Sequence, residues 1–218
     1  LIALHPKPST LGMLGPFDNV LTTNGDIALI HRRSTSGPGS IELSRSDGAP
    51  RQVLSINASL NRVTAARILP ILHEGPAGEP LTSWLYLPIG KRPGHPKPPL
   101  VVMPYPSAVY PKPPLSTLPG ELRFPVHPQV LVGAGYAVLM PSLPFNRAAG
   151  EPMTGVAEQI LEIVDKAAAL GEVDGGRVAL FGHSFGAYAA MASAPQTKRF
   201  KAIIAVAGIS DLVSYWGV

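Results

Sequence analysis

Residues 177–187 read RVALFGHSFGA and decide the fold of this chain. An apolar run enters Gly-His-Ser-Phe-Gly, and the chain leaves through residues 187–192, where alanines favour a helix. This order predicts a strand, a sharp turn and a helix, with Ser184 at the apex of the turn. We expect Gly182 and Gly186 to flank the serine because strand and helix approach so closely that a Cβ would collide.

A Gly-x-Ser-x-Gly pattern between a strand and a helix is the nucleophile elbow of α/β-hydrolases. The bare pattern is weak in a chain with 22 glycines among 218 residues, and its strand–turn–helix context raises its specificity. A glycine-rich turn in some other α/β sheet is the structural alternative. A phosphate-binding loop is disfavoured, because no Lys-Ser or Lys-Thr follows these glycines.

The partners of the serine are missing from the chain. An α/β-hydrolase orders its triad as serine, acid, histidine, yet no histidine follows His183 and the only acid beyond Ser184 is Asp211. His183 leaves the opposite side of the turn and is expected to pack. Asp211 is expected to cap the segment that follows it. The pattern therefore predicts an internal fragment of a serine hydrolase, with the triad acid and histidine beyond residue 218.

Composition predicts a folded protein and limits its partners. Hydrophobic residues make up 45% of the chain and charged residues 15%, which disfavours disorder. The chain has no cysteine, so disulfides and thiolate catalysis are excluded. A net charge of +4 suggests nucleic acid, but the basic residues at 91, 92, 97 and 112 lie among prolines and not along a helix face. We expect no nucleic acid and no membrane as partners, and no metal or other cofactor; cytoplasm and periplasm both stay open.

The chain changes its pattern near residue 65. Before it, short alternating segments and tight turns predict an antiparallel meander with strands at 26–31, 40–45 and 51–56. After it, a hairpin is followed by wholly apolar strands separated by helices, which predicts a mostly parallel sheet with helices on both faces. These later elements are expected at 68–72, 81–87, 100–103, 136–140, 153–170 (helix), 177–181 and 202–206. The predicted domains are therefore 1–65 and 66–218, the second an incomplete α/β-hydrolase sheet.

Several stretches resemble the prolyl oligopeptidase family of serine peptidases. Residues 173–188 (VDGGRVALFGHSFGAY) are similar to the elbow region of that family, and residues 199–205 (RFKAIIA) to its next strand. Residues 99–105 (PLVVMPY) are similar to the strand that ends in its oxyanion loop. The meander before residue 65 is similar to the closing blade of its β-propeller. The resemblance implies a peptidase whose propeller restricts access to smaller peptides.

Two loops depart from the family pattern. Pro106 and Ser107 follow Tyr105, where the family usually has Gly-Gly or Ala-Gly. Residues 142–147 (SLPFNR) replace a usual Arg-Gly-Ser stretch. Both loops border the substrate in such enzymes, so the resemblance implies a divergent member with altered specificity. The lasso-peptide isopeptidases are such a branch.

The resemblance assigns roles to three residues. Ser184 would be the nucleophile, and the backbone N–H of Phe185 and the hydroxyl of Tyr105 would bind the oxyanion; Tyr105 as a merely packed aromatic is the alternative. The expected partners are a peptide substrate and the remainder of the same polypeptide. An esterase or lipase on the same fold and a catalytically silent binding module stay open as other functions. His127, which precedes an expected helix, is predicted to lie in a surface loop.

Overall fold

The computed structural model of the chain describes residues 2–3, 9–10, 13–15, 18–33, 38–90, 96–114, 127–145 and 153–217. Contacts divide these residues into two compact units, one up to Ala65 and the other from Ala66 onward. Mixed sheets and helices give an α/β fold. The interpretation of the units as the end of a propeller and part of a hydrolase domain stays a prediction.

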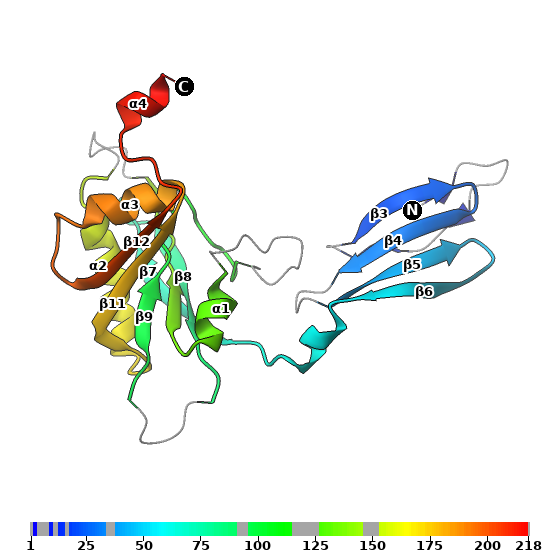
Figure 1. The fold of residues 1–218 in the computed structure, drawn as a ribbon, viewed down its shortest axis with the longest axis horizontal. Helices are drawn as coiled ribbons and strands as arrows, with labels where there is room; N and C mark the ends of the chain where they lie inside the picture. Colours follow the sequence, from blue (N-terminus) through cyan, green and yellow to red (C-terminus); the bar gives the residue numbers. More distant parts are fainter. Residues whose placement is uncertain are drawn as a thin grey trace. The chain divides into compact units, whose positions relative to one another are not determined.

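The first unit is an antiparallel meander in which each strand pairs with the next (Figure 1). Its four main strands are β3 (Asn19–Asn24), β4 (Ile27–Arg33), β5 (Gly39–Arg45) and β6 (Gly48–Ile56), accompanied by the short pair β1 (Ile2–Ala3) and β2 (Ser9–Thr10) and by the 3-10 helix η1 (Ala58–Arg62). The sequence predicted three strands here and missed β3. The last residues of β3 resemble the turn before Gly25 in sequence, and the polar threonines and asparagines of β3 give no alternating apolar pattern.

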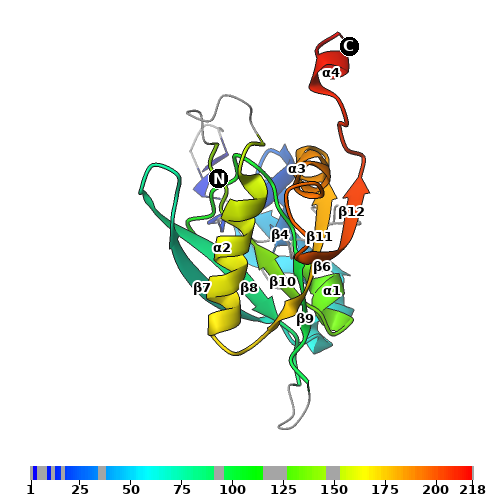
Figure 2. The same cartoon turned by 90° about the vertical axis from the view of Figure 1, so that its left-hand side faces the viewer.

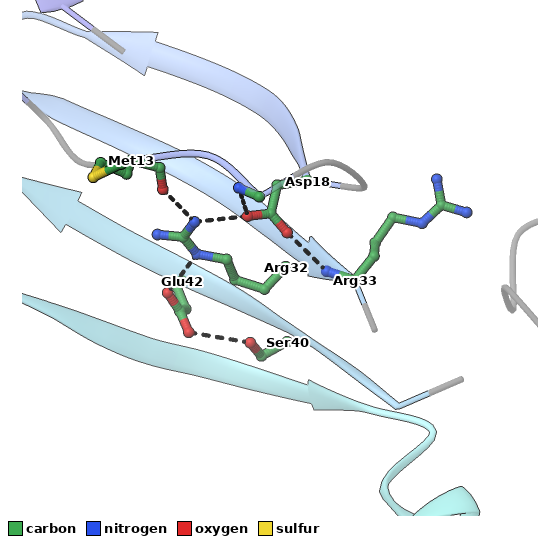
Figure 3. A network of polar contacts seen from close by, with 7 residues as sticks. Met13, Asp18, Arg32, Arg33, Ser40 and Glu42 are labelled. Atoms are coloured by element: carbon green, nitrogen blue, oxygen red, sulfur yellow. Dashed lines mark hydrogen bonds and ion pairs between the residues drawn. The ribbon is translucent and has the colours of Figure 1, made fainter. Parts of the chain in front are cut away.

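Arg32 ties the segment before β3 to the meander (Figure 3). Its Nη1 donates to Asp18 and to the carbonyl of Met13, each at 2.7 Å, and its Nε donates to Glu42 on β5 at 2.9 Å. Asp18 also accepts from the backbone N–H of Arg33. Burial opposes ionisation of Asp18, but the hydrogen bonds from Arg32 and from backbone amides outweigh it, and its pKa is lowered. This network holds three parts of the first unit together.

The second unit is built on a six-stranded mixed sheet with the order β12-β11-β9-β10-β8-β7 (Figures 1 and 2). Its strands are β7 (Arg67–Glu74), β8 (Pro80–Leu87), β9 (Pro99–Val102), β10 (Ala137–Met140), β11 (Asp174–His183) and β12 (Phe200–Val206). The pairs β10–β9, β9–β11 and β11–β12 are parallel, while β7–β8 and β8–β10 are antiparallel. The predicted hairpin and the four predicted apolar strands are therefore all present.

Helices cover both faces of this sheet (Figure 2). They are α1 (Pro128–Gly133), α2 (Val156–Ala169) and α3 (Phe185–Ser193), whereas the short α4 (Leu212–Trp216) follows β12 and has no buried residue. On one face α2 and α3 pack against strand residues such as Leu100 and Val102. On the other face Val132 of α1 belongs to a cluster with Val101 and Val138. Because successive side chains point to opposite faces, both faces need apolar residues, and the strands are apolar throughout.

Glycines set the two ends of α2. The sequence predicted a helix from Met153 to Leu170, but α2 begins at Val156, since Gly155 takes a left-handed φ of 72° that cannot belong to the helix. After its end, Gly171 has a φ of 75°, as expected of a glycine that terminates a helix. No helix of the described residues is long and apolar enough to span a membrane.

Candidate functional site

Ser184 is held in a strained backbone conformation between β11 and α3. Its φ of 55° and ψ of −122° lie in a region that non-glycine residues rarely adopt. Its N–H donates to the carbonyl of Val206 on β12 at 3.0 Å, and its carbonyl accepts from the N–H of Ala187 at 3.0 Å. Bonds on both sides thus fix the conformation. The predicted strand, sharp turn and helix are present, with the serine at the apex.

Each of the two flanking glycines allows a different segment to approach the elbow closely. A Cβ on Gly182 would collide with the carbonyl of Gly186 and lie 2.7 Å from the Cα of Ala187, so β11 and α3 do approach as closely as predicted. A Cβ on Gly186 would instead collide with the carbonyl of Pro104 and lie 3.5 Å from Cδ2 of Tyr105. The second glycine therefore brings the loop after β9 against the elbow, which the sequence pattern did not indicate.

Tyr105 opens a tight turn at the carboxyl end of β9. The N–H of Ala108 donates to the carbonyl of Tyr105 at 3.1 Å, and Ser107 has a φ of 74°. Since the ring of Pro106 fixes a negative φ, this is the type II turn, whose third position usually needs glycine. The Tyr105 side chain is 41% exposed. The structure thus places Tyr105 next to Gly186 with its ring accessible.

Phe185 is the first residue of α3 and carries a backbone N–H that the helix itself leaves without an acceptor. The helix dipole adds partial positive charge at this end, so the amide suits an oxyanion. Its ring stacks on Tyr188 at 5.8 Å between centroids and meets Phe145 edge-on at 5.7 Å. Phe145 follows β10 and is 40% exposed. Sequence reasoning did not single out Phe145, although it lies in a loop that departs from the family pattern.

The prediction for His127 was wrong. The residue is 6% exposed, and its Nδ1 accepts from the N–H of Gln129 at 3.2 Å, which caps α1. Burial lowers the pKa of His127. Its Nε2 has no hydrogen-bond partner among the described residues. Pro128, the first residue of α1, is buried as well, so the chain already lies in the interior where this helix begins.

Two acidic residues that flank the elbow in the sequence have structural roles. Asp211 caps α4 by accepting from the N–H groups of Val213 and Ser214 and from the Ser214 hydroxyl, and these bonds lower its pKa. Asp174 and Arg177 pair at 2.6 Å at the irregular start of β11. The capping role of Asp211 was predicted. No group of three or more histidine, cysteine or acidic residues that could hold a metal occurs in the described part of the chain.

The resemblance to the prolyl oligopeptidase family is confirmed by a family model. That model matches residues 123–218, which include the elbow and its glycines, whereas Tyr105 precedes the matched segment. No curated protein matches the sequence.

Solved peptidases share the fold of the chain. Porphyromonas gingivalis dipeptidyl peptidase 4 has 20% sequence identity and a TM-score of 0.56, with 94% of this chain and 30% of that chain covered. Pyrococcus horikoshii acylaminoacyl peptidase has 16% identity and a TM-score of 0.59, with 99% and 35% covered. AtxE2 isopeptidase with astexin3-dC4 bound has 18% identity and a TM-score of 0.50, with 82% and 36% covered. The chain thus spans about a third of the length of these structures.

Proposed function

Because its residues 123–218 are a prolyl oligopeptidase-family segment, we propose that the chain is part of a serine peptidase with Ser184 as its nucleophile. The hydroxyl of Ser184 attacks an amide carbonyl, the amine leaves, and water then hydrolyses the acyl-enzyme. The observation that carries this proposal is the strained serine between a buried strand and a helix N-terminus. Such strain is expected where a reactive group must be presented.

The oxyanion of the intermediate would be bound by two donors. One is the backbone N–H of Phe185 and the other is the hydroxyl of Tyr105. A donor of this kind contributes about 3 kcal/mol to transition-state stabilisation. The close approach of Gly186 to Pro104 and Tyr105 supports the pairing, because it brings the two donors to the same end of the sheet.

The triad acid and histidine would come from the remainder of the same polypeptide. No histidine follows His183 in the chain, although the base of such a triad follows its serine. The first unit would be the end of a β-propeller that restricts access to smaller peptides. Its edge strand β6 is exposed at every residue but the last, which supports a blade that is covered by neighbours.

Other functions on this fold stay open. The divergent loop of Phe145 and the similarity to AtxE2 isopeptidase favour an isopeptide bond as a candidate substrate. An esterase would use the same elbow, because the fold does not choose between ester and amide. A silent binding module would keep the fold and lack a reactive serine.

Labelling of the serine tests the proposal. The full-length polypeptide that carries this sequence is treated with a fluorophosphonate, and the modified peptide is identified by mass spectrometry. We expect one label, on Ser184, and none in Ser184→Ala. An unlabelled Ser184 in a folded protein contradicts the proposal and supports the binding module. A labelled enzyme that cleaves aryl esters but no peptide or isopeptide would be an esterase.

A further inference from the structure

A chain of buried polar side chains runs from the edge strand β7 toward the turn of Tyr105. His73 on β7 is 8% exposed, Ser83 on β8 is fully buried and Ser142, after β10, is 1% exposed. Nε2 of His73 lies 2.8 Å from Oγ of Ser83, and the N–H of Ser142 lies 2.9 Å from the same oxygen. Buried polar chains are costly unless every member is bonded. Their directions can be assigned.

The carbonyl of Glu74 fixes the tautomer of His73. That carbonyl lies 3.2 Å from Nδ1 and can only accept, so Nδ1 carries the proton. Burial lowers the pKa of His73 and favours the neutral ring, whose Nε2 must then accept from the Ser83 hydroxyl. A lone pair of Ser83 is left for the N–H of Ser142. The direction of each bond is thereby determined.

Ser142 continues the sheet after β10 has ended. Met140 pairs with Trp84 in the antiparallel register, so Ser142 reaches the level of Thr82. Its N–H donates to the Ser83 side chain and its hydroxyl donates to the Thr82 carbonyl at 2.6 Å, in place of ladder bonds. The Ser142 Oγ in turn accepts from the N–H of Tyr110 at 2.9 Å. One side chain thus joins β8 to the segment after the Tyr105 turn.

The next residue completes the attachment. Leu143 donates to the carbonyl of Ala108 at 2.9 Å and accepts from the N–H of Ser107 at 2.7 Å, so both bonds reach the second half of the turn. Trp84 Nε1 donates to the carbonyl of Tyr110 at 2.9 Å. The turn is therefore fastened to β8 on one side and lies against Gly186 of the elbow on the other.

We propose that Ser142, supported by Ser83 and His73, is a positioning residue that holds the turn of Tyr105 against the elbow. It touches neither nucleophile nor substrate in this role and acts through the place it gives the Tyr105 hydroxyl. The inference rests on the proposed function for its effect on catalysis. The mechanical part, that Ser142 restrains the turn, holds without it.

Amide hydrogen exchange of the full-length polypeptide tests the mechanical part. In Ser142→Ala we expect the amides of residues 107–110 to exchange about tenfold faster, since one buried hydrogen bond is lost. The matched control is Ser193→Ala. Ser193 is also fully buried in the second unit, and its hydroxyl also donates to a backbone carbonyl, that of Ala189 at 2.8 Å. Unchanged exchange at 107–110, or equal acceleration in Ser193→Ala, would overturn the proposal.

Kinetics test the link to Tyr105. Ser142→Ala is expected to lower kcat about tenfold with KM nearly unchanged, because a misplaced donor acts on the transition state. Ser142→Thr keeps the hydroxyl and should recover most of the loss. In a Tyr105→Phe background the effect of Ser142→Ala should shrink to about twofold or less. If the effects of Ser142→Ala and Tyr105→Phe on kcat are fully additive, the link to Tyr105 is overturned, even when hydrogen exchange shows that Ser142 restrains the turn.

The failure of the proposed function would be recognised separately. An unreactive Ser184 in the unsubstituted protein rejects the peptidase, while the exchange experiment still decides whether Ser142 restrains the turn. A reactive Ser184 whose rate of labelling is equal in Ser142→Ala and Ser193→Ala keeps Ser184 as the nucleophile and rejects Ser142 as a positioning residue.

Discussion

The elbow of Ser184 and the turn of Tyr105 are both strained turns, but different kinds of contact hold each of them in place. Each follows a parallel strand of one sheet, and each holds a serine at positive φ, 55° at Ser184 and 74° at Ser107. The elbow is fixed by its own glycines and by the adjoining strand and helix. The turn is fixed by bonds from the residues after β10, and through them by β7 and β8.

The difference separates local from long-range determination. At Gly182 the colliding atoms lie within five residues, so a short stretch of sequence determines the close approach of β11 and α3. At the turn the bonds come from Ser142 and Leu143, more than thirty positions away in the sequence, and from Trp84, 26 positions before Tyr110. A short pattern therefore identifies the nucleophile and says little about the segment that would carry the second oxyanion donor.

A Cβ at Gly182 should give the largest effect. In Gly182→Ala the added Cβ collides with backbone atoms of Gly186 and Ala187, which cannot move aside as a flexible side chain could. We expect this collision to force β11 and α3 apart and to destabilise the fold by about 3 kcal/mol. Chemical denaturation followed by fluorescence measures it. Gly133→Ala is the control, since a Cβ there meets nothing within 4 Å. Equal stability of the two variants would show that the elbow is not held by the close approach at Gly182.

Two serine-to-glycine substitutions compare the strain at the two sites. Ser107→Gly and Ser184→Gly each remove a Cβ from a left-handed backbone, and each should stabilise the protein by about 1 kcal/mol. Thermal unfolding measures the gain. Only Ser184→Gly should also abolish fluorophosphonate labelling. A loss of stability at Ser107 would mean that its side chain, not its backbone, is what the turn requires.

Lowering the pH should weaken the hydrogen bonds that hold the turn of Tyr105 before it changes the elbow of Ser184. Burial lowers the pKa of His73 from 6.5, against opposing effects of Glu74, Glu79 and Glu162 and with a contribution from Lys166. Below about pH 6.5 the unfolded chain therefore binds a proton that the folded chain excludes, and stability falls as the pH falls. His127 acts in the same direction.

The measurement is the urea midpoint at about pH 7.5 and about pH 5.5, a window above the titration of ordinary carboxylates. We expect a lower midpoint in acid, and a smaller fall in His73→Gln, which lacks a titrating ring. Relative to the intrinsic exchange rate at each pH, amides 107–110 should be less protected at the lower pH, while the protection of those of α3 should not change. If the urea midpoint falls equally in His73→Gln, His73 is not the cause of the loss of stability in acid.

Much of the second unit could be predicted from the sequence because its signals are local. Wholly apolar strands indicated a sheet covered on both faces, and α1, α2 and α3 cover them. Gly171 marked the end of α2 correctly. Gly155 was not recognised as its start, since a glycine at positive φ has no sequence signal beyond itself. The strand β3 was missed because it is mostly polar.

The sequence by itself determined the elbow: two glycines, a serine and a strand–helix transition leave little choice of backbone at residues 182–186. Only the tertiary structure decided what lies beside it. Pairing of β9 with β11 placed Tyr105 next to Gly186, and the bonds of Ser142 and Leu143 fastened its turn. Hydrogen bonds and close packing between distant segments depend on strand order and register, which no short stretch of residues contains.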